Sequence, residues 1–129
     1  GSGYGRMGHV IGRHYFDVKF IGYEYVEERV QESQRCLEIH YYPNVKVERA
    51  DLSHSDFTPA LANYYFMYDF GSRPAIEKTL LDLQNIARTQ SITLIGRGRN
   101  TRDTIERRHP WLAEVNPPQH FHNYSIYKS

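Results

Sequence analysis

The 129-residue chain has a single cysteine, Cys36, and almost no excess charge of either sign. One cysteine excludes an internal disulfide and a zinc site built from cysteines, and it suits a reducing compartment. A formal net charge of +1 gives no overall basic field that would indicate a nucleic-acid partner. The chain also lacks an apolar run near the roughly 20 residues of a membrane span, and no signal peptide is visible. We therefore expect a cytoplasmic protein with no membrane partner.

What the chain does contain is enough apolar sequence for a core. Hydrophobic residues make up 40% of it, and this length suits one domain, which we expect to span residues 1–129. Charge gathers locally in one segment, which we interpret as a solvated loop and helix face rather than a nucleic-acid site. Its arginines are Arg97, Arg99, Arg102, Arg107 and Arg108.

Glycines recur at the start of the chain, and an acid follows about twenty residues later. Because glycine has no Cβ, the loop 1–8 can turn sharply and approach a ligand closely. Residues 18–23 have the pattern of a strand that is buried on both faces, and Glu24 follows it directly. A carboxylate at that place can accept hydrogen bonds from ribose hydroxyls. Together these features indicate a site for a nucleotide cofactor.

The glycine spacing fits two cofactor patterns. Gly3, Gly5 and Gly8 satisfy the G-x-G-x-x-G spacing of dinucleotide-binding proteins. Gly1, Gly3 and Gly5 satisfy the G-x-G-x-G pattern of enzymes that use S-adenosylmethionine (SAM). The loop alone therefore leaves both cofactors open.

Helical and strand patterns alternate along the rest of the chain, which predicts an α/β fold with a mostly parallel sheet. Ser72 and Pro74 supply an N-cap and a first-turn proline for one of the helices. The last two strands are joined by a short loop around Pro117 with no helix, so they must run antiparallel. The expected helices cover residues 6–14, 25–40, the segment after Ser72, and 101–108; the expected strands cover 18–23, 45–50, 64–68 (buried), 91–95, 111–115 and 122–127.

The terminal antiparallel hairpin decides between the two cofactor patterns. A dinucleotide-binding half continues with parallel strands, whereas the class I SAM-dependent methyltransferase fold ends in an antiparallel hairpin at the sheet edge. From Gly1 to its C-terminus the chain resembles that Rossmann-like family. The resemblance implies SAM as the cofactor and transfer of its methyl group to an acceptor. An NAD-dependent oxidoreductase domain and a non-catalytic, methyltransferase-like binding module are the alternative functions.

The resemblance implies roles for individual residues near the cofactor. Glu24 matches the family's ribose-binding acid, although by itself it is also compatible with a surface acid at a strand end. Tyr25 can stack on adenine or simply cover a helix start. Asp51 matches the acid that contacts adenine, or it caps a helix or turn. The implied cofactor-binding residues are Gly1, Gly3, Gly5, Glu24, Tyr25, Asp51 and Leu52.

A second group of residues follows the strand at 64–68 and resembles the family's substrate motif. Asp69 is the candidate catalytic residue, because a carboxylate there can orient an acceptor or take its proton as a general base. It can also bind the amino end of SAM, or cap the next helix together with Ser72. Tyr68 and Phe70 are the implied substrate-binding residues. The segment departs from the Asn/Asp-Pro-Pro-Tyr/Phe motif of amino-methylating DNA enzymes, so a protein or small-molecule acceptor is favoured over a nucleobase.

Two further expectations concern what accompanies this domain. In the family the glycine loop follows a first strand at the centre of the sheet, so we expect the chain to be N-terminally incomplete, with a hydrophobic strand immediately before Gly1. No resident metal is expected. His120 and His122 share one strand face, but the sequence places no third ligand beside them.

Overall fold

A computed structural model describes all residues from 1 to 129 and divides the chain into two compact units, Gly1–Leu52 and Ser53–Ser129. Each unit has its own sheet and its own apolar core. The assignment of one methyltransferase domain to residues 1–129 stays a prediction, as does the strand expected before Gly1.

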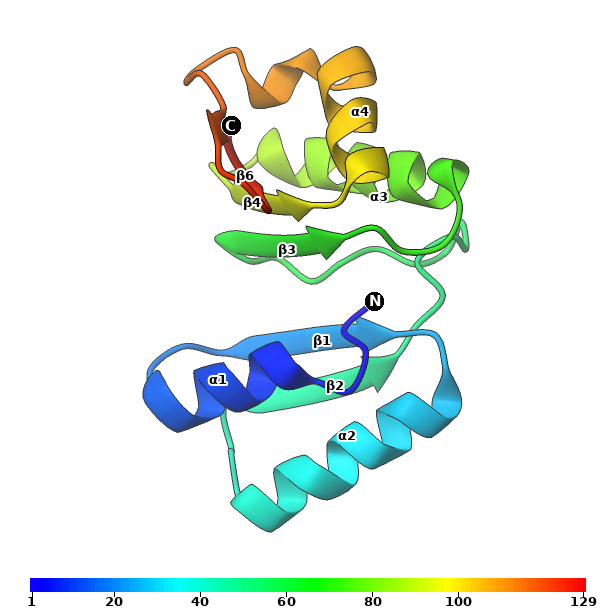
Figure 1. The fold of residues 1–129 in the computed structure, drawn as a ribbon, viewed down its shortest axis with the longest axis vertical. Helices are drawn as coiled ribbons and strands as arrows, with labels where there is room; N and C mark the ends of the chain where they lie inside the picture. Colours follow the sequence, from blue (N-terminus) through cyan, green and yellow to red (C-terminus); the bar gives the residue numbers. More distant parts are fainter. The chain divides into compact units, whose positions relative to one another are not determined.

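In the unit Gly1–Leu52, two parallel strands lie side by side and carry two helices (Figure 1). The helix Glu27–His40 buries Val30 and Leu37 against Val47, which forms a small core. The expected strand at 18–23 begins two residues late, and its Ile21 side chain is 43% exposed, so the prediction of burial on both faces was wrong. The elements are α1 (Arg6–His14), β1 (Phe20–Glu24), α2 (Glu27–His40) and β2 (Val45–Arg49).

Two glycines allow α1 to lie against the rest of this unit. A Cβ on Gly8 would come within 2.8 Å of the Val45 Cγ1 atom, and one on Gly12 within 2.7 Å of the Tyr42 ring. Both glycines are buried and lie four residues apart, on one face of the helix. The helix therefore needs a surface without side chains where it meets Tyr42 and Val45.

In the unit Ser53–Ser129, four strands form a mixed sheet in the order β3-β4-β6-β5. Strands β3 and β4 are parallel, and β6 runs antiparallel to both β4 and β5. The antiparallel ending predicted from the sequence is therefore present. The elements are β3 (Tyr64–Tyr68), α3 (Arg73–Ala87), β4 (Thr93–Arg97), α4 (Arg99–Arg108), the 3₁₀ turn η1 (Pro110–Leu112), β5 (Gln119–His120) and β6 (Ser125–Lys128).

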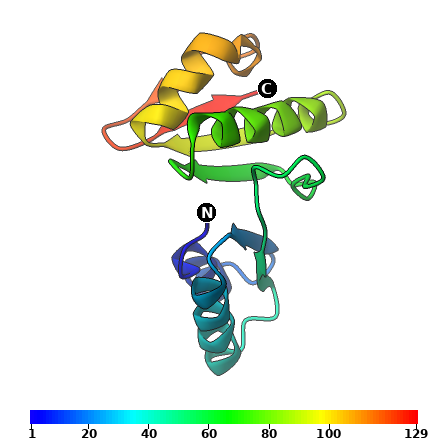
Figure 2. The same cartoon turned by 90° about the vertical axis from the view of Figure 1, so that its right-hand side faces the viewer.

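The core of this unit lies between the sheet and its helices, which run along it (Figures 1 and 2). Met67 from β3 is buried with Leu94 and Ile76. Side chains alternate across a strand, so Tyr65 lies on the same face as Met67, and the other three β3 side chains point the other way. Tyr64, Phe66 and Tyr68 are 64%, 50% and 56% exposed, which contradicts the expectation of a fully buried strand; the other buried hydrophobic members of the core are Leu80, Leu83, Ile86, Ile92, Ile105, Leu112 and Tyr127.

Helix α3 begins where the sequence predicts. Ser72 occupies the N-cap position and Pro74 lies in the first turn, although Ser72 makes no side-chain capping bond. The helix has 15 residues and carries a buried stripe that includes Leu80 and Leu83. No helix of the chain combines the length and the apolar character needed to cross a bilayer.

The strand expected at 111–115 does not form. Pro110 opens a 3₁₀ turn in which the Leu112 N–H donates to the His109 carbonyl at 3.2 Å and the Ala113 N–H to that of Pro110 at 2.8 Å. Local bonds of this kind use the donors that a strand would need. The partner of β6 in the hairpin is the two-residue β5. Strand β4 lies two residues later than the expected 91–95, and α4 begins two residues earlier than the expected 101–108.

We expect Gly12→Ala to destabilise the first unit by about 1–3 kcal/mol, the usual cost of overpacking a fitted contact. The new methyl group overlaps the Tyr42 ring. The higher helix propensity of alanine stabilises the helix by less than this overlap costs. Chemical denaturation would measure the loss. Arg13→Ala, on the exposed side of α1, is the matched control, and equal effects in both variants would contradict the packing argument.

His109 predicts a pH dependence for the second unit. Its side chain is buried, its Nδ1 accepts from Trp111 Nε1 at 3.2 Å, and its Nε2 has no partner. Burial lowers the pKa of His109, with opposing effects from Glu77 and Arg108. The unfolded chain therefore binds the proton first as the pH falls. The stability from a neutral His109 is complete above the unfolded pKa of about 6.5 and is lost as the pH falls through the lower folded pKa.

The fluorescence of Trp111, the only tryptophan, would report this unfolding directly. We expect the melting temperature to fall between neutral and mildly acidic pH, and the fall to be smaller in His109→Gln. His122→Gln, at an exposed histidine, is the control. An unchanged pH profile in His109→Gln would exclude His109 as the cause.

Candidate functional site

The carboxylate of Glu24 holds the glycine loop at the end of β1. Its Oε2 accepts from the Gly3 N–H at 2.7 Å and its Oε1 from the Val26 N–H at 3.1 Å. The residue is only 5% exposed. A second tie is the hydrogen bond from the Ser2 N–H to the Tyr23 carbonyl at 2.6 Å. The loop is thus fixed against the carboxyl end of β1.

The charge of Glu24 depends on those hydrogen bonds. Burial by itself would raise the pKa of this carboxyl, but the N–H groups of Val26 and Gly3 and nearby positive charge hold the pKa below its usual value. The positive charge includes the Arg29 guanidinium at 3.8 Å. Glu24 is therefore an ionised, nearly buried acceptor at neutral pH.

The loop has a backbone conformation that favours glycine. Gly3 has φ 57° and Gly5 has φ 72°, in the left-handed region. Gly5 is also crowded, because a Cβ there would lie 3.3 Å from the Ser33 hydroxyl, whereas one on Gly3 would meet no atom within 4 Å. The loop is therefore tight on its inner side at Gly5 and open at Gly3.

Ser33 supports the loop from α2, and the sequence reasoning missed it. Its hydroxyl lies 3.3 Å from the Gly3 carbonyl and 2.7 Å from that of Arg29. The residue is fully buried on the same helix face as Val30 and Leu37. A small polar residue within an apolar helix stripe is the signal that could have identified it.

The other predicted cofactor residues gather at the same edge of this sheet. Tyr25 follows Glu24 and is 61% exposed, and Asp51 follows β2 and is exposed. The two strand ends are linked by a hydrogen bond of 2.9 Å from the Ala50 N–H to the Glu24 carbonyl. Leu52 is half-buried next to Asp51. The parallel pairing of β1 and β2 thus brings residues from both strand ends to one edge.

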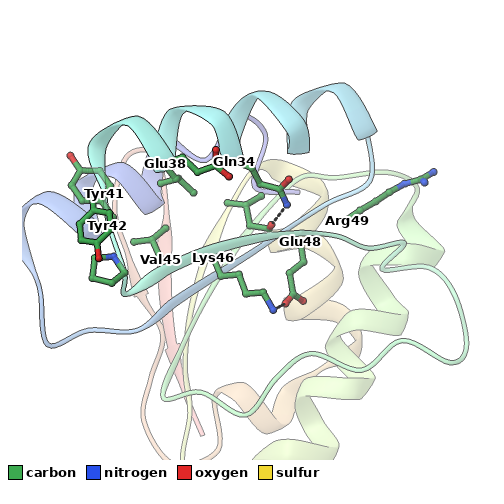
Figure 3. A pocket seen from close by; sticks show the side chains of 11 residues that line it. Gln34, Glu38, Tyr41, Tyr42, Val45, Lys46, Glu48 and Arg49 are labelled. Carbon is green, nitrogen blue, oxygen red and sulfur yellow. Dashed lines mark hydrogen bonds and ion pairs between the residues drawn. The ribbon is translucent and has the colours of Figure 1, made fainter.

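A groove of about 600 Å³ lies elsewhere on this unit, between α2 and the outer edge of β2 (Figure 3). The side-chain amide of Gln34 crosses it to donate to the Val47 carbonyl at 3.0 Å, and Lys46 pairs with Glu48. Its wall contains none of the predicted cofactor residues; it consists of Gln34, Leu37, Glu38, Tyr41, Tyr42, Pro43, Val45, Lys46, Val47, Glu48 and Arg49. The groove is therefore separate from the predicted cofactor site.

Asp69 lies in the second unit and is engaged by the start of α4. Its Oδ1 accepts from the Thr101 N–H and hydroxyl, both at 2.8 Å, and its Oδ2 from the Asn100 N–H at 3.1 Å. Gly98 has φ 105°, and a Cβ there would collide with the Asp69 carboxylate. Asp69 therefore caps α4. The alternative that Asp69 caps the next helix, α3, together with Ser72 was wrong. Its catalytic role stays a prediction.

The two predicted substrate residues differ in accessibility. Tyr68 is 56% exposed, and the Arg97 guanidinium lies over its ring, 5.3 Å from the centroid. Phe70 is half-buried and packs against the core of its unit. Tyr68 is thus the one of the pair that presents a ring to a ligand.

His120, near the C-terminus, has protein partners. His120 Nδ1 lies 2.8 Å from the Ser125 hydroxyl, and its Nε2 lies 3.9 Å from Glu106. No group of three or more His, Cys, Asp or Glu side chains is arranged to hold a metal ion.

No protein-family model matches the sequence, and no curated protein matches it. Solved structures do match the fold. An RNA methyltransferase from Salinibacter ruber, solved with S-adenosyl-L-homocysteine, aligns over 99% of this chain and 74% of its own, with 16% identity and a TM-score of 0.58. A TehB-like SAM-dependent methyltransferase from Corynebacterium glutamicum aligns over 99% of this chain and 75% of its own, with 11% identity and a TM-score of 0.59.

A third solved structure, a protein from Pyrococcus horikoshii, aligns with 11% identity and a TM-score of 0.58. The alignment covers 98% of this chain but only 62% of that protein, so the chain spans less than two thirds of its length. At sequence identities this low, the similarity shows the fold alone. The chain has the Rossmann-like fold of class I SAM-dependent methyltransferases.

Proposed function

We propose that this chain forms part of a SAM-dependent methyltransferase. The observation that carries the proposal is the ionised Glu24 carboxylate, which holds the left-handed glycine loop at the carboxyl end of a parallel strand. This is the edge at which α/β folds bind nucleotide ligands. The methyltransferases of the same fold support SAM as that ligand.

The residues present fit such a cofactor. A carboxylate offers about four acceptor positions, and backbone N–H groups use two at Glu24, so acceptor capacity remains for ribose hydroxyls. Gly3 leaves its surroundings open, which lets a ligand approach the backbone. The adenine contacts belong to Tyr25, Asp51 and Leu52; the glycine-loop residues are Gly1, Gly3 and Gly5.

Bound SAM supplies an activated methyl group on a sulfonium. The chain's own residues bind the nucleoside, orient the acceptor and exclude water. Asp69 is proposed to act on the acceptor as base or orienting group, with Tyr68 and Phe70 beside it. The acceptor is unidentified, and the departure from the DNA-enzyme motif favours a protein or a small molecule over a nucleobase.

Ligand-dependent melting tests the cofactor assignment. We expect SAM and S-adenosylhomocysteine to raise the melting temperature, because a ligand at a hundredfold excess over its Kd stabilises by about 2.7 kcal/mol. NADP should give no shift, because its 2′-phosphate would be repelled by the Glu24 carboxylate. Stabilisation by NAD without any effect of S-adenosylhomocysteine would overturn the proposal.

Replacing Glu24 with Gln should weaken S-adenosylhomocysteine binding by about 1.5–3 kcal/mol, the range for a hydrogen bond to a charged group. Calorimetry would measure this at a temperature where both proteins are folded. Glu28→Gln, at an exposed acid in the first turn of α2, is the matched control. Equal affinities in the folded Glu24→Gln variant and the parent would remove Glu24 from the site.

Asp69 needs a test that separates chemistry from helix capping. We expect Asp69→Asn to lower methyl transfer by about 10²–10⁴-fold, the range for lost general-base work, while S-adenosylhomocysteine binding changes only a few-fold. It should also destabilise the second unit by about 1–3 kcal/mol, because the α4 N–H groups lose a charged acceptor.

Thr101→Val provides the comparison, because it removes one hydrogen bond to Asp69 and leaves the carboxylate in place. Labelled SAM with a cell extract as the source of acceptor would report transfer. If Thr101→Val lowers transfer as much as Asp69→Asn does, Asp69 acts through the position of α4 and not on the acceptor.

A further inference from the structure

Three arginines lie at the carboxyl edge of the sheet in the second unit. Arg97 ends β4, while Arg73 and Arg99 are the first residues of α3 and α4. The strand register places Arg97 beside Tyr68 at the end of β3, and both helices start at this edge (Figure 1). The Arg73 Nε atom donates to the Asn100 side chain at 3.3 Å, which joins the two helix starts.

These guanidinium groups have little negative charge as a partner. Arg73 is bonded to a neutral amide, and Arg97 lies over the Tyr68 ring; neither forms an ion pair. Arg99 is 93% exposed and reaches Asp103 only at 3.9 Å. Asp69, which follows β3 at the same edge, directs its carboxylate at the N–H groups of α4, which offset its charge.

Two arginines farther along α4, in contrast, form close ion pairs with acids. Arg102 pairs with Glu106 at 2.7 Å, and Arg108 pairs with Glu77. Those two fit the solvated helix face that the sequence suggested. Arg97 and Arg99 keep most of their N–H donors available. The segment 97–108 therefore contains arginines that are paired with acids and arginines that are free to bind a ligand.

Exposed aromatic rings accompany the arginines. Tyr68 already holds Arg97 on its face. The β5–β6 turn carries Phe121 and Tyr124, whose rings stack at 4.7 Å and are 46% and 40% exposed. Since Ser125, the residue that follows this turn, pairs with Gly96 of β4, the turn lies at the same edge as Arg97. A ligand here meets both cationic and flat aromatic groups.

We propose that Arg73, Arg97 and Arg99 bind a phosphate group of the methyl acceptor, with the aromatic rings contacting the part of the acceptor next to it. Guanidinium groups match phosphate oxygens with paired hydrogen bonds, and a phosphate offers enough acceptors for several arginines at once. The assignment of this phosphate to the methyl acceptor rests on the proposed methyl transfer. The phosphate site itself does not, and it can be tested without cofactor.

Binding of uridine 5′-monophosphate tests the site, with uridine and inorganic phosphate as comparison ligands. Amide NMR shifts in the intact protein would locate the contact. We expect shifts at Tyr68, Arg97 and Arg99, binding that weakens as salt increases, and a weaker response to uridine. Arg97→Gln combined with Arg99→Gln should lower affinity about tenfold or more, the factor for a lost charge-assisted hydrogen bond.

Arg88→Gln, an exposed arginine beyond the other end of α3, is the control for net charge and should leave affinity within about twofold. An oligouridylate that binds far more tightly than the mononucleotide would assign the phosphate to a nucleic-acid backbone; equal affinities would assign it to a small molecule. Absence of binding by every phosphate probe, or binding unchanged in the folded double variant, would overturn the site. Failure of S-adenosylhomocysteine to bind while the mononucleotide still does would remove the methyl transfer and leave the phosphate site standing.

Discussion

The hydrogen bonds from Gly3 and Val26 to the Glu24 carboxylate determine the geometry of the first unit. One oxygen holds the glycine loop and the other holds the residue that precedes α2, so a single side chain connects the segments on either side of β1. Burial alone would raise the pKa of this carboxyl and favour the protonated acid, and the two N–H donors together with nearby positive charge reverse that preference. The loop, the helix start and the negative charge of Glu24 therefore support one another.

In the second unit, Asp69 likewise accepts hydrogen bonds from backbone N–H groups at a helix start. In a parallel sheet all strands end at the same edge. The helices that follow begin there, and their first backbone N–H groups lack partners within the helix. Asp69 follows β3 but binds the start of α4, three elements later along the chain, and Gly98 leaves the space that its carboxylate occupies. An acid after a parallel strand can thus stabilise a helix start as well as take part in chemistry. Position alone does not separate the two roles.

Local patterns explain which elements could be predicted. Pro74 and the apolar stripe of α3 specify that helix within its own segment, and its start was correct. Glu24 could be singled out because it follows a strand about twenty residues after a glycine loop, and the structure shows its bond to Gly3; its contact with ribose stays a prediction. The bond between Asp69 and Thr101 spans 32 residues and has no local signature. The 111–115 segment has strand-forming residues, but Pro110 and the buried His109 favour a turn that no pattern of alternation reveals.

In the proposed methyl transfer, the hydrogen bonds that engage Asp69 would cost less activity than they would in a hydrolase. A sulfonium methyl group is already activated, so an acceptor that is nucleophilic needs position more than proton removal. Position is what the second unit's edge offers: Tyr68 presents a ring, Arg97 lies on that ring, and Arg73 is held by Asn100. Cationic groups there also raise the local concentration of anionic molecules, despite a net charge near zero for the whole chain. In the proposed reaction, this arrangement would select an acceptor by its charge, and the acceptor's reactivity would depend on the methyl donor.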